Sequence, residues 1–288
     1  RLESPEAIER TFGRYVPERM DDFAWESDRI AFRMYGPALQ ATGEISSGVD
    51  VWSKSVRYPV IDKRYKLNDY HNEHGDGLDF YKVGPTLGCG GTAVCVKRKL
   101  YMSQNYTDWK VLANGPIRTV FELRYAPWKT PEGKVAEVKR ISIDLGSNLN
   151  RFESTYSVEG GKGKLPIAVG IVERGEKGVF RSDAARGWMT YREPANPKYG
   201  TTSCGVALLP GANAYATRMN GNAVLVTDVA PEKPLVYYAG ACWDKSGDFV
   251  TPAAWNTYVS SAAARAAAQL TVDIKLSLIH ISEPTRPY

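Results

Sequence analysis

Apolar and polar residues alternate with a period of two along most of this 288-residue chain. In the segment 117–125, Phe121 and Leu123 fall on one side of the chain, whereas Glu122 and Arg124 fall on the other. Successive side chains of a strand point to opposite faces, so the alternation predicts strands that bury one face. Turn signals rich in glycine, proline and asparagine separate these segments. The pattern predicts an all-β fold.

About ten short strands at this spacing favour a large antiparallel sandwich. In one of them, Phe32 and Met34 share a face, and Arg33 and Tyr35 share the opposite face. The expected strands cover residues 29–35, 50–56, 92–97, 108–113, 117–125, 134–144, 151–158, 167–173, 187–191, 203–209, 223–228 and 235–241, with a closing strand over 270–275.

Two segments favour helices instead. Residues 251–270 start with Thr251, which suits an N-cap, and Pro252, which suits the first turn, and an alanine-rich run follows. Trp255 begins an apolar stripe at helical spacing, so one face of this helix is expected to dock on the sandwich. A helix of one or two turns is expected over 59–67.

The two ends of the chain stand outside this pattern. The chain begins at Arg1 without a leader pattern, so we expect a fragment that lacks its natural N-terminus. The last residues, 276–288 (LSLIHISEPTRPY), resemble a translated sequencing adapter. Because no repeat or linker divides the remainder, we expect one domain over 1–275 and a non-native tail over 276–288.

Composition excludes several classes of protein. Hydrophobic residues make up 43% and charged residues 24%, as in ordinary globular proteins. No run approaches the roughly 18 apolar residues of a membrane span. The four cysteines are too sparse for a disulfide scaffold and show no metal-binding spacing, so we expect small buried hydrophobes, with a chance disulfide as the alternative in an exported protein. The net charge of +5 is spread out, which argues against nucleic acid. Taken alone it is typical of a solvated surface, and it suits an anionic small substrate or polymer equally well.

Residues with chemical potential concentrate in the segment 70–84. Outside the tail, His71 and His74 are the only histidines of the chain. Gly75 and Gly77 disfavour a helix here and predict a tight loop. Because imidazole titrates near neutral pH, both histidines are candidates for proton transfer. The alternative is a structural loop in which they only cap backbone groups.

The same loop offers a weaker metal hypothesis. His71, His74, Asp76 and Asp79 form an H-x2-H-x-D-x2-D pattern whose nitrogen and oxygen atoms could hold Ca²⁺ or Zn²⁺. The spacing matches no zinc signature, because H-E-x-x-H places its histidines four residues apart on a helix. We therefore expect no cofactor, with a divalent metal as the alternative.

A glycine-rich stretch, 84–92, follows the histidine loop. It lacks the Gly-Lys-Ser/Thr ending of a phosphate loop, and no helix-forming run follows it. We expect a backbone that bends sharply, or passes close to a bound sugar, before the strand at 92–97.

Four stretches together carry a resemblance to a known family. They are ESDRIAFRMYGP at 26–37, SGVDVWSK at 47–54, GDGLDFYKVG at 75–84 with Tyr70-His71 before it, and VLANGPIRTVFE at 111–122. Together they resemble the bacterial family called domain of unknown function 4861, over most of 23–275. Its members occur in polysaccharide-utilisation loci, beside unsaturated glucuronyl hydrolases.

The resemblance implies a fold and an activity. The family is similar in architecture to the galactose-mutarotase-like β-supersandwich, and one relative is understood as an oligosaccharide dehydratase in ulvan breakdown. The resemblance thus implies removal of water from a non-reducing-end uronic acid, which leaves a 4,5-unsaturated sugar. It also implies a periplasmic or secreted protein of a bacterium, with an anionic oligosaccharide as its partner and no membrane span.

Such an elimination needs a base and an acid. The C5 proton of a uronate is weakly acidic, so a base must take it while an acid protonates the departing 4-hydroxyl. His71 or His74 can serve as the base near pH 7. Tyr70 or Tyr81 can serve as the acid, or as the base if a neighbouring cation lowers the phenol pKa.

The elimination also needs a cation on the substrate carboxylate, so that enolate-like charge can build up. Arg33 suits this role because its planar fork matches a carboxylate with two bonds. Lys54 and Lys82 are substitutes, and Tyr35 and Trp52 could flank or stack on the sugar ring. The competing interpretation places Arg33 in a pair with a strand neighbour and Trp52 in the core.

Two other classes of function stay open at this stage. A glycoside hydrolase could use Glu73 or Asp79 together with Glu26 or Glu122 as paired carboxylates. A polysaccharide lyase would differ from a dehydratase only in its leaving group. A non-catalytic carbohydrate-binding or mutarotase-like module would bind sugar without changing it, and sandwich folds host many such modules.

Overall fold

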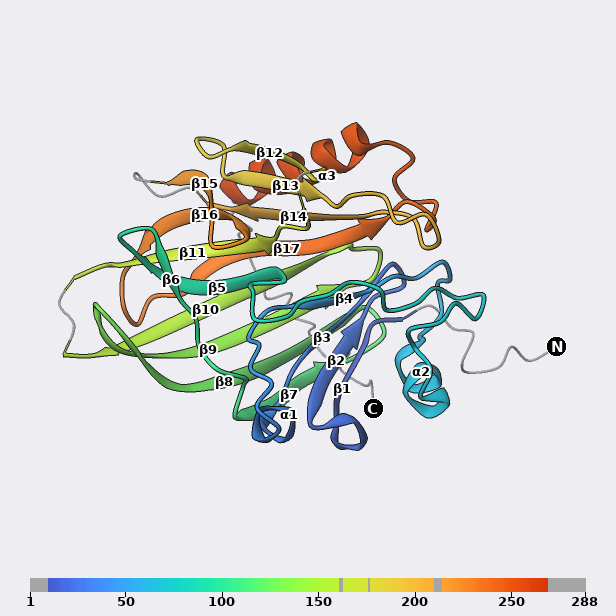
Figure 1. Cartoon of the computed structure of the whole chain (residues 1–288), viewed down its shortest axis with the longest axis horizontal. Helices are drawn as coiled ribbons and strands as arrows, with labels where there is room; N and C mark the ends of the chain where they lie inside the picture. The colour runs from blue at the N-terminus through green and yellow to red at the C-terminus, as the bar shows by residue number, and fades with distance from the viewer. Residues whose placement is uncertain (1–9, 161–162, 176, 210–213, 269–288) are drawn as a thin grey trace, which may run out of the picture.

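Three antiparallel sheets and one long helix make up the fold (Figure 1). The computed structural model describes residues 10–160, 163–175, 177–209 and 214–268. The predicted large antiparallel β-sandwich with a C-terminal helix is confirmed. The closing strand expected at 270–275 and the tail at 276–288 lie outside the described residues.

The largest sheet has eight strands, in the order β12-β13-β14-β17-β10-β9-β8-β7. Its inner face is apolar, as the alternation predicts. Phe121 and Leu123 are fully buried, whereas Arg124, which follows Leu123 and points to the other face, is exposed. The strands are β7 (Asp108–Asn114), β8 (Arg118–Thr130), β9 (Gly133–Asp144), β10 (Leu149–Glu159), β12 (Val179–Asp183), β13 (Trp188–Arg192), β14 (Thr202–Leu208) and β17 (Leu235–Trp243).

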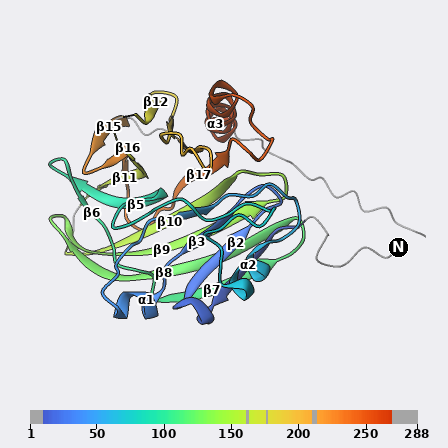
Figure 2. The same ribbon diagram turned by 45° about the vertical axis from the view of Figure 1, so that its right-hand side comes forward.

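Two smaller sheets pack side by side on that inner face (Figures 1 and 2). The five-stranded sheet covers β13, β14 and β17, and the four-stranded sheet covers β7 and β8, where Phe23 stacks on Phe121. One continuous apolar core joins all three sheets. The five strands are β15 (Tyr215–Met219), β16 (Asn222–Val229), β11 (Leu165–Val172), β5 (Cys89–Val96) and β6 (Lys99–Tyr101); the four are β1 (Phe12–Val16), β2 (Asp22–Glu26), β3 (Ala31–Met34) and β4 (Asp50–Trp52).

The long helix α3 (Pro252–Ala267) lies on the outer face of β13 and β14. Thr251 caps it as predicted, because its side chain accepts a hydrogen bond from the Ala254 backbone N–H. Gly205 lets the helix approach closely, since a Cβ there would stand 2.4 Å from the Val259 side chain. No helix among the described residues is long and apolar enough to cross a membrane.

Two short helices and a 3₁₀ turn complete the architecture. Helix α2 (Ile61–Leu67) confirms the short helix expected at 59–67, whereas α1 (Pro37–Ala41) and η2 (Pro17–Arg19) were not predicted. Five strands also escape the alternation rule. Every residue of β2 is buried, so neither of its faces is exposed to solvent. The other four, β1, β6, β12 and β15, are edge strands with mixed exposure.

The glycine-rich stretch bends sharply and enters β5 earlier than expected, at Cys89. Gly88 has a positive φ of 57° and bridges to Val49, and a Cβ at Gly88 would lie 2.3 Å from the Val49 carbonyl oxygen. The close approach predicted for this stretch is therefore to the backbone beside β4. All four cysteines are buried and free, as expected of small hydrophobes.

Candidate functional site

Strand β3 is buried on both faces, and its two faces meet different surroundings. Phe32 and Met34 enter the main core. Ala31 packs on the other side, in a second apolar cluster built by α2 and the loop that follows it. Arg33 points toward this second side, so the alternation places a guanidinium beneath the histidine loop rather than in water.

Three carboxylates occupy the Arg33 guanidinium. Its Nε donates to Asp50 at 2.7 Å, its Nη2 to Asp79 at 2.7 Å, and its Nη1 to Asp22 at 3.4 Å. The Arg33 side chain is only 4% exposed, and its guanidinium carbon lies 5.1 to 5.2 Å from the ring centres of Tyr35, Trp52 and Tyr70. Arg33 therefore holds the carboxylates in place and has no free fork for a substrate.

The carboxylates in this cluster outnumber the cations. Asp22 also accepts a bond from Arg19, so three carboxylates face two guanidiniums. Burial raises the pKa of Asp22 to about 6, although Arg33 and Arg19 oppose the shift. Burial, with the nearby Asp50 charge, raises the pKa of Asp79 well above its usual range. The cluster therefore favours retention of a proton.

His71 stands at the mouth of this cluster. Its Nδ1 lies 3.0 Å from the Asp79 carbonyl oxygen and 3.5 Å from the Asp79 carboxylate, while its side chain is 65% exposed. A carbonyl only accepts hydrogen bonds, so Nδ1 must carry the proton and Nε2 of the neutral ring is left with a free lone pair. Nε2 has no hydrogen-bond partner among the described residues, so this nitrogen is open to a ligand.

Tyr70 and Arg19 lie next to His71. The Tyr70 ring packs against the imidazole, with ring centres 4.6 Å apart, and the Tyr70 hydroxyl accepts a hydrogen bond of 3.3 Å from Arg19 Nε. The Arg19 side chain is 24% exposed. We call the whole set the Arg33–His71 network; its members are Arg19, Asp22, Arg33, Asp50, Tyr70, His71 and Asp79.

The other predicted catalytic residues lie apart from the network's mouth. His74 directs Nε2 to the backbone carbonyl and carboxylate of Asp69, at 3.1 and 3.0 Å. Tyr81 is buried in the main core, where Cys204 Sγ donates to its hydroxyl at 3.6 Å. His71 and the buried Tyr70 are thus brought into contact at the network's mouth, and His74 and Tyr81 are not.

The predicted binding residues divide in the same way. Tyr35 joins the interior of the network, donating to Asp50 at 2.8 Å, and Trp52 is buried against Tyr70. Lys54 is fully buried and donates to Glu26 at 2.6 Å, so its charge is neutralised within an internal ion pair. Lys82 is exposed on the segment that leads away from the histidine loop.

The possible metal ligands are already engaged elsewhere. Lys63 and Arg64 donate to Asp76, and Arg33 donates to Asp79. Within the described ranges, no three histidine, cysteine, aspartate or glutamate side chains gather in a way that could hold a metal ion. Asp76 and Asp79 are thus held by internal cations, and a bound metal stays an alternative.

The carboxylates considered for a hydrolase also have separate partners. Glu73 accepts the backbone N–H groups of Gly75 and Gly77, which tightens the histidine loop. Glu26 pairs with the buried Lys54, and Glu122 pairs with Arg140 on the outer face of the large sheet. The structure thus shows no pair of them working at a shared site.

Three network members escaped sequence reasoning: Arg19, Asp22 and Asp50. One signal was available for Asp50, because it lies directly opposite Arg33 in the β3–β4 register, where opposite charges pair. Arg19 and Asp22 belong to the 3₁₀ turn and to a strand buried throughout, and neither element shows a periodicity that would have marked it.

The sequence of this chain matches the model of a known family. The sequence model of the family described as domain of unknown function (DUF4861) matches residues 2–272. The chain belongs to this family. A similar protein from Formosa agariphila, named Uncharacterized protein P7, is 36% identical over 283 residues, which cover 92% of this chain and 70% of that protein. The family resemblance drawn from the four sequence stretches is therefore confirmed.

Proposed function

We propose that this DUF4861 protein is a carbon–oxygen lyase that removes water from the non-reducing-end uronic acid of an acidic oligosaccharide. The observation that carries the proposal is the state of His71. Its Nδ1 is held by the Asp79 carbonyl oxygen, its Nε2 has no hydrogen-bond partner among the described residues, and its ring packs on Tyr70, whose hydroxyl accepts a bond from Arg19. A fixed tautomer with a free Nε2 is what a general base near pH 7 requires. Export to the periplasm or beyond belongs to the same proposal.

The proposed elimination breaks the C5–H and C4–O bonds of the uronate and forms a C4–C5 double bond. His71 Nε2 takes the proton from C5 of the uronate, and the electrons of the C5–H bond become the C4–C5 double bond. The C4–O bond breaks, and the departing hydroxyl receives a proton and leaves as water. The Tyr70 phenol, which lies against the His71 ring, is the proposed source of that proton.

In this proposal Arg19, and not Arg33, binds the substrate carboxylate. Arg33 is closed off by three carboxylates, whereas Arg19 is partly exposed and lies beside Tyr70. A guanidinium there can neutralise the uronate carboxylate as enolate-like charge builds up at C5. Arg33 acts as a positioning residue, because it fixes Asp79, which in turn fixes the His71 ring.

The charge of the network supports the same assignment. When His71 accepts the C5 proton it becomes an imidazolium, which lies 3.5 Å from the Asp79 carboxylate. The network holds three carboxylates and two guanidiniums, so the imidazolium supplies the positive charge that the network lacks. In the form in which Asp79 is ionised, its carboxylate therefore stabilises the protonated base in the transition state.

The test is product analysis after incubation with uronic-acid oligosaccharides of several linkages, including ulvan fragments. A dehydratase gives a product lighter by one water that absorbs in the ultraviolet through a new conjugated double bond. A polysaccharide lyase gives the same absorbance with two shorter sugars, and a hydrolase gives a new reducing end without absorbance. Sugar binding without any product on all substrates would overturn the proposal in favour of a binding module.

A chelator arm separates metal dependence from the proposed proton transfer. Activity that survives extensive dialysis against EDTA supports elimination by protein side chains alone. We expect survival, because the possible ligands Asp76 and Asp79 are held by internal cations. Activity that is lost to EDTA and restored by Ca²⁺ or Zn²⁺ would contradict that part of the proposal.

A further inference from the structure

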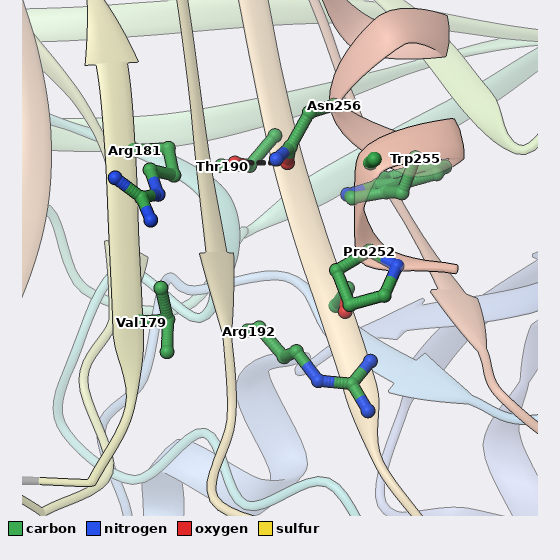
Figure 3. Close-up of a pocket in the computed structure, with 9 residues that line it drawn as sticks. Val179, Arg181, Thr190, Arg192, Pro252, Trp255 and Asn256 are labelled. Carbon is green, nitrogen blue, oxygen red and sulfur yellow. Dashed lines mark hydrogen bonds between the residues drawn. The ribbon is translucent and has the colours of Figure 1, made fainter.

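A pocket of about 410 Å³ lies between the start of α3 and the strands β12, β13 and β14 (Figure 3). This volume falls in the range of small-molecule sites, about 300 to 1,000 Å³. The pocket opens on the outer face of the large sheet. The Arg33–His71 network lies on the opposite, inner side of the large sheet, where the segment after Asp79 contacts β14 through Tyr81 and Cys204. Figures 1 and 2 show α3 on the outer side of that sheet, away from the four-stranded sheet and α2.

Strand register brings two arginines to this pocket. Arg181 lies opposite Thr190, and Val179 lies opposite Arg192, so the arginines are diagonal neighbours on one face of the β12–β13 hairpin. Diagonal positions of an antiparallel pair stand about 7 to 8 Å apart, within reach of long side chains. Both arginines therefore line the same pocket from adjacent strands, with the Arg192 guanidinium directed toward Pro252 (Figure 3).

Neither guanidinium has a strong internal partner. Arg192 reaches only Asp244, at 3.9 Å, and Arg181 makes no ion pair within the part of the chain that the structure describes. Two cations on one face repel each other, and an anion bound between them would remove that cost. This contrasts with Arg33, whose charge is met by three carboxylates.

The remaining polar groups of the pocket are suited to donate hydrogen bonds. The Thr190 hydroxyl donates to Asn256 Oδ1 at 2.7 Å, which leaves the Asn256 amide N–H₂ to act as a donor. The Ser203 hydroxyl adds another group that can donate. Pro252 and Ala253 bring the N-terminal end of α3, with its partial positive charge, to the rim. No aspartate or glutamate is among the lining residues.

We infer that this pocket is a second binding site for an acidic sugar unit, one that carries ring hydroxyls and a single carboxylate or sulfate group. The diagonal arginines fit the oxyanion, since a guanidinium fork pairs with planar or tetrahedral oxyanions through two bonds. Asn256, Thr190 and Ser203 fit the ring hydroxyls, and Pro252 gives an apolar wall. The choice of a sugar over other organic anions rests on the proposed function, whereas the choice of an anion rests on the pocket alone.

The test uses the full chain carrying His71→Gln, so that no substrate is consumed. Glucuronate, glucose 6-sulfate and neutral glucose are titrated while the indole N–H resonance of Trp255, which lines the pocket, is followed by NMR. Glucuronate or the sulfated sugar is expected to shift this resonance in a saturable way, and glucose is not. The two acidic sugars together show which oxyanion the pocket prefers.

A matched pair of variants locates the binding. Arg181→Gln combined with Arg192→Gln is expected to weaken binding about tenfold or more, the loss of at least one charged hydrogen bond. Arg186→Gln is the control, because Arg186 lies in the turn of the same hairpin, is 82% exposed and does not line the pocket. Equal affinity in the double variant and the control, or equal binding of glucose, would overturn the inference.

The outcome is separable from that of the proposed function. If the wild-type chain forms an unsaturated product and the double arginine variant binds acidic sugars normally, the second site is wrong and the lyase stands. If no product forms but the variants weaken binding as expected, the second site stands and the lyase is wrong.

Discussion

Two buried charge clusters of this protein differ in one respect, their access to solvent. Between the large and the five-stranded sheet, Lys139 Nζ donates to Glu137 at 2.7 Å and to Thr92 at 3.0 Å, and both charged side chains are at most 2% exposed. In the Arg33–His71 network, Arg33 is equally buried, but the chain of contacts ends at His71, whose side chain is 65% exposed. The first cluster is sealed, and the second is open.

The difference follows from what covers each strand. Positions 137 and 139 of β9 point inward, where a whole sheet covers them and every partner is internal. Arg33 is covered by α2 and a glycine-hinged loop, which can present an imidazole to solvent while holding its inner nitrogen. A sealed ion pair can only affect folding, whereas an open network can also move a proton to a ligand.

The largest expected effect concerns the sealed cluster. Lys139→Met leaves the Glu137 carboxylate buried without its cation, so we expect a loss of about 3–5 kcal/mol in the free energy of unfolding. Lys139→Met combined with Glu137→Leu removes both charges and is expected to recover most of that loss. Urea unfolding of the single and double variants measures both. A double variant no more stable than the single one would show that the cluster is not an isolated pair.

The next largest effect concerns the open network. His71→Gln is expected to lower kcat by about 100-fold or more, because the general base is lost. Its melting temperature should hardly change, since the side chain is mostly in solvent. His74→Gln is the matched control, three residues away and held on Asp69 instead of Asp79. Equal losses in both variants would mean that the loop as a whole, and not the His71 base, matters.

The sequence could indicate the two ends of the open network but not the connection between them. Alternation correctly put Arg33 on the face opposite Phe32, and the glycines correctly predicted a loop around His71. Neither pattern shows that α2 and the loop fold back over β3, because long-range packing leaves no periodic trace. Arg33 was therefore expected to clamp the substrate directly, whereas its fork is filled by aspartates from β2, β4 and the loop.

The sealed cluster was still harder to foresee. Lys139 and Glu137 fall on the inward side of β9 by simple alternation, and an interior lysine breaks the rule that strand charges face water. Only the five-stranded sheet, whose Thr92 meets the pair, makes that position tolerable. The fold class followed from period two, but the identity of the buried charges depends on which sheets stack.

Asp22 gives a smaller, pH-dependent effect. Burial raises its pKa from 3.8 to about 6 in the folded protein, so its contribution to stability is fully present below pH 3.8 and is lost as pH rises through 6. We expect this one group to account for a fall of about 2–3 kcal/mol between pH 4 and 7. Asp22→Asn should flatten that part of the profile of unfolding free energy against pH.

The control for that profile is Asp108→Asn, which removes an aspartate that is 69% exposed on β7. This variant should keep the wild-type slope between pH 4 and 7, because an exposed carboxylate titrates similarly in the folded and unfolded chains. A profile of Asp22→Asn that runs parallel to wild type would contradict the raised pKa of Asp22 and, with it, the excess of negative charge in the network.

The smallest effect separates stability from function in a matched pair of hydroxyl deletions. The Tyr65 hydroxyl donates to Asp22 at 3.1 Å in the open network, and the Tyr237 hydroxyl donates to the Gly90 carbonyl at 2.9 Å beside the sealed cluster. Each Tyr→Phe change should cost about 1 kcal/mol of unfolding free energy, since a buried hydrogen bond donated by the hydroxyl is lost. The Tyr237 hydroxyl also accepts a long bond of 3.5 Å from Lys139 Nζ. Only Tyr65→Phe should also lower activity a few-fold, because the Tyr65 bond helps to hold the charge of Asp22 in the network that supports His71. Equal stability losses with lower activity only in Tyr65→Phe would support a catalytic role of the Arg33–His71 network. Equal activities in the two variants would show that the Tyr65–Asp22 bond does not influence the His71 base.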